Sequence, residues 1–338
     1  MSRRFETASS PHIKPKTSVT KVMGQVLLAL VPGIAIYTGL FGWGVITNIV
    51  IACVTGLAFE MAMLQLRGKP FKPFLKDLSA VVTAVLLAVA IPPGSPWWLI
   101  TVGMLFAIVV AKQLYGGLGY NPFNPAMIGY VVLLLCFPVE MTQWQAPLAD
   151  VAENCRSLAH TFTTVFSAGN CNVDGYTAAT VLDAARTAVS QESSVLNAAS
   201  GFVASAGYEW VAIAWAVGGV FLMWRGIIGW HIPVGMIAAL LIVATAGWAI
   251  APERLLNPIT HLIGGATLLG AFFIATDPVS ACTTVKGRVI YGALIGVLVY
   301  VIRSWGGYPD AVAFAVLLAN LSAPMIDYYS KPKVFGYQ

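Results

Sequence analysis

The residues outside the apolar part of the chain that most suggest chemistry are those of the run DGYTAAT, residues 174–180. This run holds one carboxylate and two hydroxyls, but it contains no base to activate a nucleophile. The sequence also has no Walker loop, no dinucleotide-binding glycine motif and no nucleophile elbow. A self-contained hydrolase is therefore not predicted. As an alternative to a chemical role, Asp174 or Thr177 can cap the start of a helix.

Three further polar residues stand at the ends of apolar runs. Asn121 and Asn124 belong to the sequence Asn-Pro-Phe-Asn-Pro, in which the prolines remove backbone donors and keep the chain extended, so both amides can face a ligand. Asn124 also precedes Pro125, which suits a helix cap. Asp277, in Ala-Thr-Asp-Pro-Val-Ser, can bind a cation or the polar edge of a ligand, or it can form a plain interfacial turn.

Glu60 is the one carboxylate that lies well inside an expected membrane span. A charged group at that depth is costly, so it is by default a functional hypothesis, here an ion ligand on an ion path. The alternative is an acid that pairs with Arg67 or Lys76.

The five cysteines and four histidines do not predict a metal site. Cys53, Cys136 and Cys282 are isolated, no Cys-x-x-Cys occurs, and the histidines lack ligand spacing. Cys155 and Cys171 share one loop and can form a disulfide in an oxidising compartment.

Composition indicates which elements must position these residues. With 58% hydrophobic and 10% charged residues in 338, a soluble globule is excluded. The expected fold is an all-α polytopic membrane protein with about ten transmembrane helices. The third span is short and stops at Pro92-Pro93-Gly94, which suggests a half-helix. The predicted spans cover residues 22–41, 43–66, 78–91, 97–112, 124–139, 209–224, 230–250, 258–276, 289–304 and 310–328.

The positions of lysine and arginine predict the orientation. If both termini are cytoplasmic, fifteen of these residues lie on the cytoplasmic side and four on the outer side, as the positive-inside rule requires. The net charge of +5 then reflects topology, and no nucleic-acid partner is expected. The start lacks a signal-peptide pattern, so the first span is expected to be retained. The predicted segments are a cytoplasmic start at 1–21, membrane repeats at 22–139 and 209–328, a periplasmic loop at 140–208, and a cytoplasmic tail at 329–338.

An internal repeat relates the two membrane segments. The sequence GYNPFNPAMIGYVVLLL at 119–135 resembles GYPDAVAFAVLLAN at 307–320, and the third span resembles the eighth in its small-residue start and its proline-containing stop. These pairs indicate two five-helix repeats. Since five is odd, the repeats must be inverted, which usually places a site near the midplane, between broken helices.

Taken in order, these motifs resemble the RnfD family, the flavin-bearing membrane subunits of the Rnf (or Rsx) ion-translocating electron-transport complex. The resemblance runs nearly end to end and includes Ser-Pro-His at 10–12, the Asn-Pro-Phe-Asn-Pro segment, DGYTAAT, Ala-Thr-Asp-Pro-Val-Ser and the tail APMIDYYSKP at 323–332. A more distant similarity is to the B subunit of sodium-pumping NADH:quinone oxidoreductases.

The resemblance implies that Thr180 is the acceptor of a covalent FMN, linked through a phosphoester. Asp174, Gly175, Thr177 and Ala179 then form the recognition motif around it. The sequence departs from the family pattern at Ala178, where glycine is common, and at Val181, where proline often follows. Because no base is built into this segment, a separate flavin transferase is the expected route of attachment.

The resemblance also implies a second flavin, riboflavin or FMN, held noncovalently near the cytoplasmic side, with Asn121, Asn124 and Asp277 as its expected contacts. The expected function is that of a translocase subunit in the bacterial inner membrane. Electrons from ferredoxin or NADH would pass through the other subunits of the complex, and this subunit would relay them through its flavins between the two membrane faces, coupled to ion movement. It would not be an enzyme by itself. The alternatives are the sodium pump's B subunit, a channel resembling urea transporters, and a structural subunit without a cofactor.

Overall fold

The computed structural model describes residues 18–145, 157–167, 182, 187, 207–252, 255–306, 308 and 310–332. Every secondary-structure element in these ranges is a helix, which confirms the predicted all-α class. Five of the helices are long and apolar enough to cross a membrane, and four shorter apolar helices accompany them. The chain is therefore a polytopic membrane protein, and the count of ten spans stays a prediction.

The first group of helices runs from residue 19 to residue 142. Several ends have a clear local cause: the Ser18 side chain accepts a hydrogen bond from the backbone N–H of Lys21 at the start of α1, and Gly94 takes a φ of 71° in the turn after α4. The elements are α1 (Val19–Phe41), α2 (Gly44–Leu66), α3 (Phe71–Leu75), α4 (Ser79–Ala90), α5 (Trp97–Met104), the π-helical η1 (Leu105–Gln113), α6 (Pro125–Cys136) and α7 (Pro138–Thr142).

The second group follows a short helix, α8 (Leu158–Ser167). The sequence predicts one span at 258–276, but the structure divides it into three pieces around Gly264 and Gly265, and Gly265 has a φ of 63° that favours glycine. The elements are α11 (Tyr208–Trp224), α12 (His231–Ile250), α13 (Pro258–Ile263), α14 (Thr267–Leu269), the π-helical η3 (Gly270–Ile274), α15 (Val285–Trp305) and α16 (Val312–Ser330).

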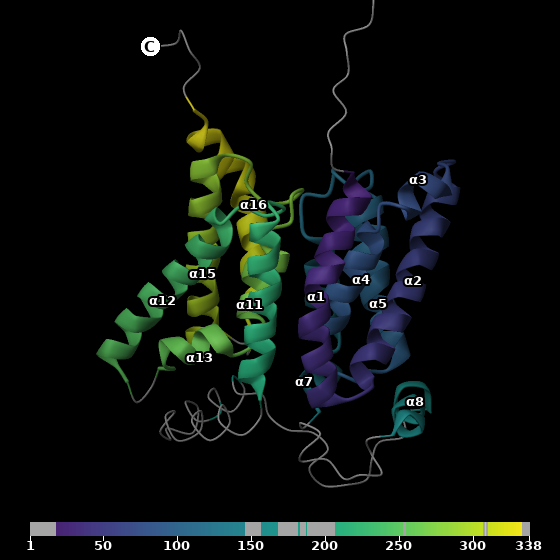
Figure 1. Ribbon diagram of the computed structural model, residues 1–338, viewed down its shortest axis with the longest axis horizontal. Coiled ribbons are helices and arrows are strands. Elements are labelled where there is room, and N and C mark those ends of the chain that lie inside the picture. The colour runs from purple at the N-terminus through teal and green to yellow at the C-terminus, as the bar shows by residue number, and fades with distance from the viewer. Residues whose placement is uncertain are drawn as a thin grey trace, which may run out of the picture.

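The two groups lie side by side and meet through equivalent helices (Figure 1). Helix α1 packs against α11, the first helix of each group, and α6 packs against α16, the last apolar helix of ten residues or more in each group. In Figure 1, α1 begins at the top of the molecule and α11 begins at the bottom, so the paired helices run in opposite directions. This arrangement fits the two inverted repeats predicted from the sequence.

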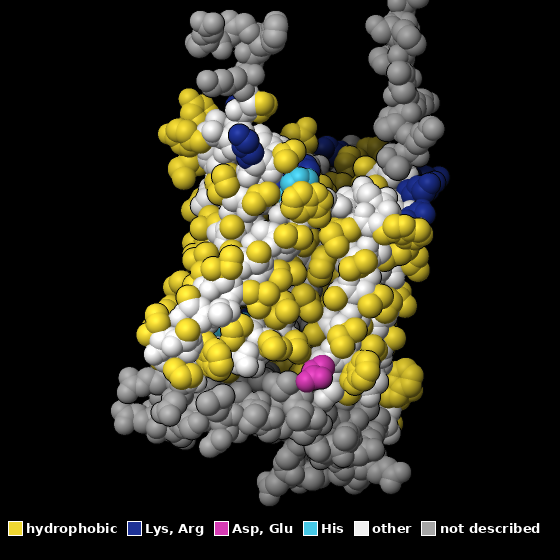
Figure 2. Space-filling view, turned by 60° about the vertical axis from the view of Figure 1, so that its left-hand side comes forward, with side chains coloured by type: hydrophobic (Ala, Val, Ile, Leu, Met, Phe, Trp, Pro, Cys, Tyr) yellow, Lys and Arg dark blue, Asp and Glu magenta, His cyan; other side chains and the backbone are white. Residues whose placement is uncertain are grey.

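The surface has the pattern of a membrane protein. Hydrophobic side chains cover the middle of the face shown in Figure 2, and lysine and arginine gather at the end where α1 begins. Exposed tryptophans stand at or near helix ends, as in the aromatic belts at membrane interfaces. They are Trp43, Trp97, Trp210, Trp224, Trp230 and Trp305.

Candidate functional site

Two cavities lie along the contact between the helix groups, and the first gathers all three residues predicted to contact the second flavin. This Asn121 cavity encloses about 880 Å³ of space, including its open mouth, and it lies toward the end of the molecule where α1 begins. Asn121, Asn124 and Asp277 line it, together with Lys112 and the apolar side chain of Phe273. Residues more than 150 positions apart in the sequence thus share one site.

Asn124 caps α6, as the alternative interpretation of its sequence context predicts. Its Oδ1 accepts hydrogen bonds from the backbone N–H groups of Ala126 (3.0 Å) and Met127 (3.3 Å). Its Nδ2 donates to the carbonyl oxygen of Ile274 across the two helix groups at 3.2 Å. The side chain therefore joins η3 to α6 at the cavity wall.

Asn320 is a buried residue that the sequence analysis did not single out. In the amide orientation that satisfies both of its groups, its oxygen accepts from the backbone N–H of Asn124 at 3.0 Å. Its NH₂ group donates to the Tyr291 hydroxyl oxygen at 2.5 Å and to the Val316 carbonyl. Asn320 in α16 thus supports the start of α6 from the other half of the molecule.

Asn121 differs from Asn124 because half of its amide has no partner among the described residues. Its Nδ2 donates to the carbonyl oxygen of Phe123 at 3.0 Å, whereas its buried Oδ1 accepts no hydrogen bond from the described part of the chain. The side chain is 4% exposed. A buried unpaired acceptor costs free energy, so it is a natural place for a ligand donor.

Asp277 lies in a turn, which agrees with the turn that was the alternative interpretation of this residue. One of its oxygens accepts from the Ser280 hydroxyl at 2.7 Å, and the other accepts from the backbone N–H of Val279 at 3.5 Å. Burial raises the pKa of this carboxyl, while these hydrogen bonds oppose the rise. The turn also places Asp277 on the lining of the Asn121 cavity.

Glu60 is buried and paired, but its partner is neither Arg67 nor Lys76, the two cations that the alternative interpretation named. Lys112 Nζ lies 2.8 Å from both carboxylate oxygens of Glu60, and the two side chains are 1% and 2% exposed. Lys112 stands at the end of η1, a helix that lies beside α2 in space but not in the sequence. Pairing of this kind makes a buried charge tolerable.

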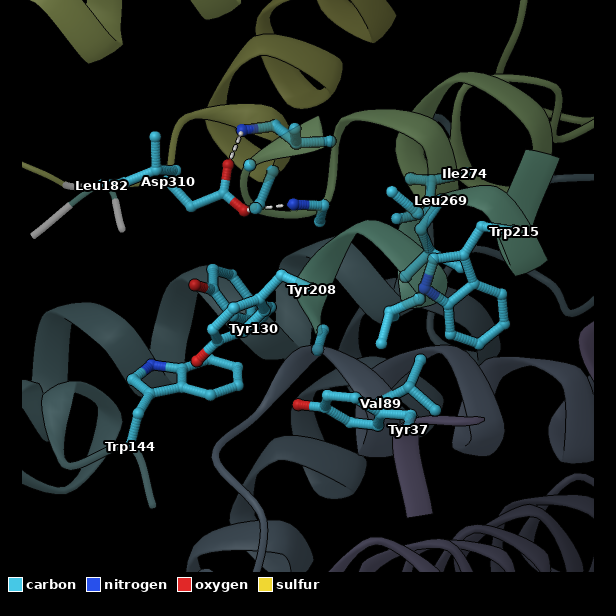
Figure 3. Close-up of a pocket in the computed structure, with 18 of the residues that line it drawn as sticks. Tyr37, Val89, Tyr130, Trp144, Leu182, Tyr208, Trp215, Leu269, Ile274 and Asp310 are labelled. Atoms are coloured by element: carbon cyan, nitrogen blue, oxygen red, sulfur yellow. Dashed lines mark hydrogen bonds between the residues drawn. The ribbon is translucent and has the colours of Figure 1, made fainter. Parts of the chain in front are cut away.

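The second cavity, the Leu182 cavity, lies toward the other end of the molecule. It encloses about 1200 Å³ including its open mouth, and its mostly apolar lining includes the aromatic residues Tyr37, Tyr130, Trp144 and Trp215. Figure 3 shows several of these rings around one space. Leu182, whose side chain is 5% exposed, lies on the same lining.

Asp310 organises the polar edge of the Leu182 cavity (Figure 3). One oxygen accepts from the backbone N–H of Ala266 at 3.0 Å, and the other accepts from the backbone N–H of Val312 and from Arg303. Arg303 also donates to the His261 carbonyl oxygen at 2.7 Å. These bonds stabilise the break between α13 and α14.

The two cavities share a wall. Phe273 lines the Asn121 cavity, while the next residue, Ile274, lines the Leu182 cavity. In the same way, Ala126 lines the first and Met127 the second. The wall is therefore built from η3 and the first turn of α6, the two segments that Asn124 joins. π-helical turns such as η3 occur frequently at functional sites.

The predicted attachment motif lies outside the described residues. This applies to Asp174, Gly175, Thr177, Ala179 and Thr180, and to the predicted pair Cys155 and Cys171. Leu182 is the described residue that follows the motif most closely. Cys53, Cys136 and Cys282 are free thiols, and the described ranges contain no group of three histidine, cysteine or acidic side chains that could hold a metal ion.

The fold and the cavities define a class: a multi-pass, all-α membrane protein with a cavity toward each end of the contact between its two halves. A model of the NQR2, RnfD, RnfE family matches residues 6–336. The chain belongs to this family. Relatives named as the D subunit of an ion-translocating oxidoreductase complex are 50% identical in Citrobacter koseri and 49% identical in Escherichia fergusonii and Salmonella arizonae, each covering 99% of both chains.

Proposed function

We propose that this protein is the electron-relaying membrane subunit of an ion-translocating oxidoreductase complex, with two flavins between its helix groups. The observation that carries the proposal is the pair of neighbouring cavities that have adjacent residues of η3 and α6 in their linings. Electron carriers held in two such cavities would form a relay across the contact between the helix groups. The family and the name shared by the relatives support this function and imply other subunits of a complex as partners.

The Asn121 cavity fits the isoalloxazine ring of a noncovalent riboflavin or FMN. A flavin ring presents one N–H donor between two carbonyl acceptors, and the unpaired Oδ1 of Asn121 supplies an acceptor for that donor. The aromatic and aliphatic lining, including Phe272 and Phe273, suits the apolar faces of the ring. When bound, the flavin supplies the electron chemistry, and the protein orients it and excludes water.

The Leu182 cavity fits a flavin tethered to Thr180. Leu182 follows Thr180 by two residues, and two peptide units span at most about 7 Å, so a group on Thr180 can reach this cavity. Its tyrosine and tryptophan side chains can stack against an aromatic ring. The absence of a base in DGYTAAT agrees with attachment by a separate flavin transferase.

The proposed setting is the bacterial inner membrane. The cationic end of the molecule, where α1 begins, faces the cytoplasm together with both termini, and residues 140–208 face the periplasm. The Asn121 cavity then opens near the cytoplasmic side. Glu60, buried at the same end, is the proposed ion ligand.

The first experiment tests the covalent flavin. The purified chain is denatured and separated on a gel, where a covalently bound flavin stays with the protein and fluoresces. We expect fluorescence from the wild-type chain and none from Thr180→Ala. Thr163→Ala, which changes an exposed threonine of α8, is the matched control and should stay fluorescent. Fluorescence that persists in Thr180→Ala would refute the assignment, and a dark wild-type chain would favour a channel or a structural subunit.

A further inference from the structure

Glu60 belongs to a polar cluster that extends from the surface of the molecule to the Asn121 cavity. The Glu60 cluster comprises Arg67, Gln113, Glu60, Lys112 and Ser79. The half-buried Arg67 donates to the Gln113 side-chain oxygen at 2.7 Å, and Gln113 donates to Glu60 at 2.9 Å. Lys112 donates to Glu60 and, at 2.7 Å, to the Ser79 hydroxyl.

Lys112 and Ser79 belong to both the cluster and the cavity. Both residues line the Asn121 cavity, while the Lys112 ammonium also lies against Glu60. Lys112 and Asp277 are the charged residues among the described side chains that line this cavity. Among the described residues, Lys112 is thus the cation on the lining of this cavity, and its ammonium is paired with Glu60.

We propose that Lys112 couples the charge of the ligand in the Asn121 cavity to cation binding at Glu60. This inference rests on the proposed function, because it takes a flavin as the ligand. An electron received from a one-electron donor adds one negative charge to the cavity. Because the Lys112 ammonium then balances that charge, it neutralises the negative charge of the Glu60 carboxylate less fully. Glu60 therefore takes up one H⁺ or Na⁺. When the electron leaves, the cation is released and the pair with Lys112 is restored.

The geometry supports this exchange for a physical reason. In a buried site, charges act over several ångströms with little screening, so one ammonium between two anionic groups cannot fully neutralise both. The lysine has a flexible stem and no further acidic neighbour within ion-pair distance in the described ranges. Gln113 and Arg67 extend the hydrogen-bonded chain from Glu60 toward the more exposed end of the molecule, which is the side from which a cation would arrive.

The test uses the full-length chain carrying Thr180→Ala, so that the noncovalent flavin alone is observed. Its midpoint potential is measured by mediator titration in the parent and in Glu60→Gln, Lys112→Met, the double variant and the control Lys76→Met, which changes an exposed lysine. Lys112→Met should lower the potential and Glu60→Gln should raise it. Each should change the ratio of reduced to oxidised flavin at a fixed solution potential by on the order of tenfold. The midpoint potential of the double variant should lie close to that of the parent. The control Lys76→Met should have the same potential as the parent.

A second measurement follows the cation itself. The potential is titrated against Na⁺ at constant pH and against pH at constant Na⁺. In the parent the potential should rise with one of the two cations by more than the proton uptake of the flavin itself explains. That extra dependence should disappear in Glu60→Gln and in the double variant, where only the dependence due to the flavin's own protons remains. Two results would refute the coupling and leave the second flavin in place. One is bound flavin whose potential is unchanged in Lys112→Met, and the other is an extra cation dependence that survives in Glu60→Gln. Absence of noncovalent flavin from the parent would overturn the coupling together with the second-flavin part of the proposed function.

Discussion

Asn121 and Asn124 carry the same side chain three positions apart, but their hydrogen bonds give them different roles. Asn124 uses both ends of its amide, for the cap of α6 and for the Ile274 carbonyl. Asn121 leaves its Oδ1 unpaired at the cavity lining. Asn124 therefore contributes mainly to the stability of the wall, and Asn121 offers an acceptor to a ligand.

Substitution of the two asparagines should separate stability from flavin binding. Asn124→Ala should lower the Tm by several degrees, because loss of the cap costs about 1 kcal/mol and the unpaired Ile274 carbonyl adds about 1–3 kcal/mol. Asn121→Ala should leave the Tm close to wild type and reduce the noncovalent flavin released on denaturation. Asn124→Asp keeps the cap but loses the hydrogen bond to the Ile274 carbonyl, so it separates the two contributions. Equal losses of Tm in both alanine variants would contradict this division.

The sequence marked three residues that line the Asn121 cavity, but it missed the partner of Glu60. Proline spacing marked Asn121 and Asn124, and a proline-containing stop marked Asp277, while their role as flavin contacts stays a prediction. The pair of Glu60 with Lys112 depends on how α2 packs against η1, which periodicity does not reveal. Arg67 and Lys76 were nearer in sequence to the end of the second span, and sequence distance was the wrong guide. Asn320 resembled an ordinary polar residue at the end of an apolar run.

At the scale of the elements, close helix packing depends on small residues where α1 crosses α11. A methyl group added at Gly218 would overlap the carbonyl oxygen of Ala29, and one added at Gly33 would overlap the ring of Trp215. Small residues let helices in membranes approach closely. Apolar periodicity located most helices within a few residues, but it did not predict the break at Gly264 and Gly265. Hydropathy continues through that break, while the backbone bonds to Asp310 and Arg303 that stabilise it come from distant residues.

Two glycine substitutions test this packing. Gly218→Ala should lower the Tm of the purified protein, because the backbone of α1 must shift to make room for the methyl group. Gly39→Ala, in α1, is the matched control, since nothing lies within 4 Å of the added methyl group. It should leave the Tm unchanged or raise it, as alanine favours a helix over glycine by about 1 kcal/mol. A Gly218→Ala protein as stable as the control would show that the two helices are free to separate.

At the scale of the whole molecule, the inverted arrangement of the helices places an ion pair and a cavity toward each end. The described ranges contain two ion pairs, one in each helix group. The cation of the first is Lys112, at the end of the continuous helix formed by α5 and η1, and the cation of the second is Arg303, near the end of α15. Each of these helices corresponds to the fourth predicted span of its group. One pair borders the Asn121 cavity and the other borders the Leu182 cavity. The two helix groups thus place one cavity, each bordered by an ion pair, toward each end of the molecule.

Because the two ends of the molecule differ, the chain must cross the membrane in one orientation. Cysteine labelling can measure that orientation. In a chain whose five native cysteines are replaced, Lys72→Cys places a thiol between α2 and α4, and Thr163→Cys places one on the exposed side of α8. The excess of lysine and arginine where α1 begins predicts that position 72 faces the cytoplasm. A membrane-impermeant maleimide should therefore label Thr163→Cys in intact cells, and it should label Lys72→Cys only after the membrane is opened. Labelling of Lys72→Cys in intact cells would reverse the orientation and would place the Asn121 cavity toward the outer face.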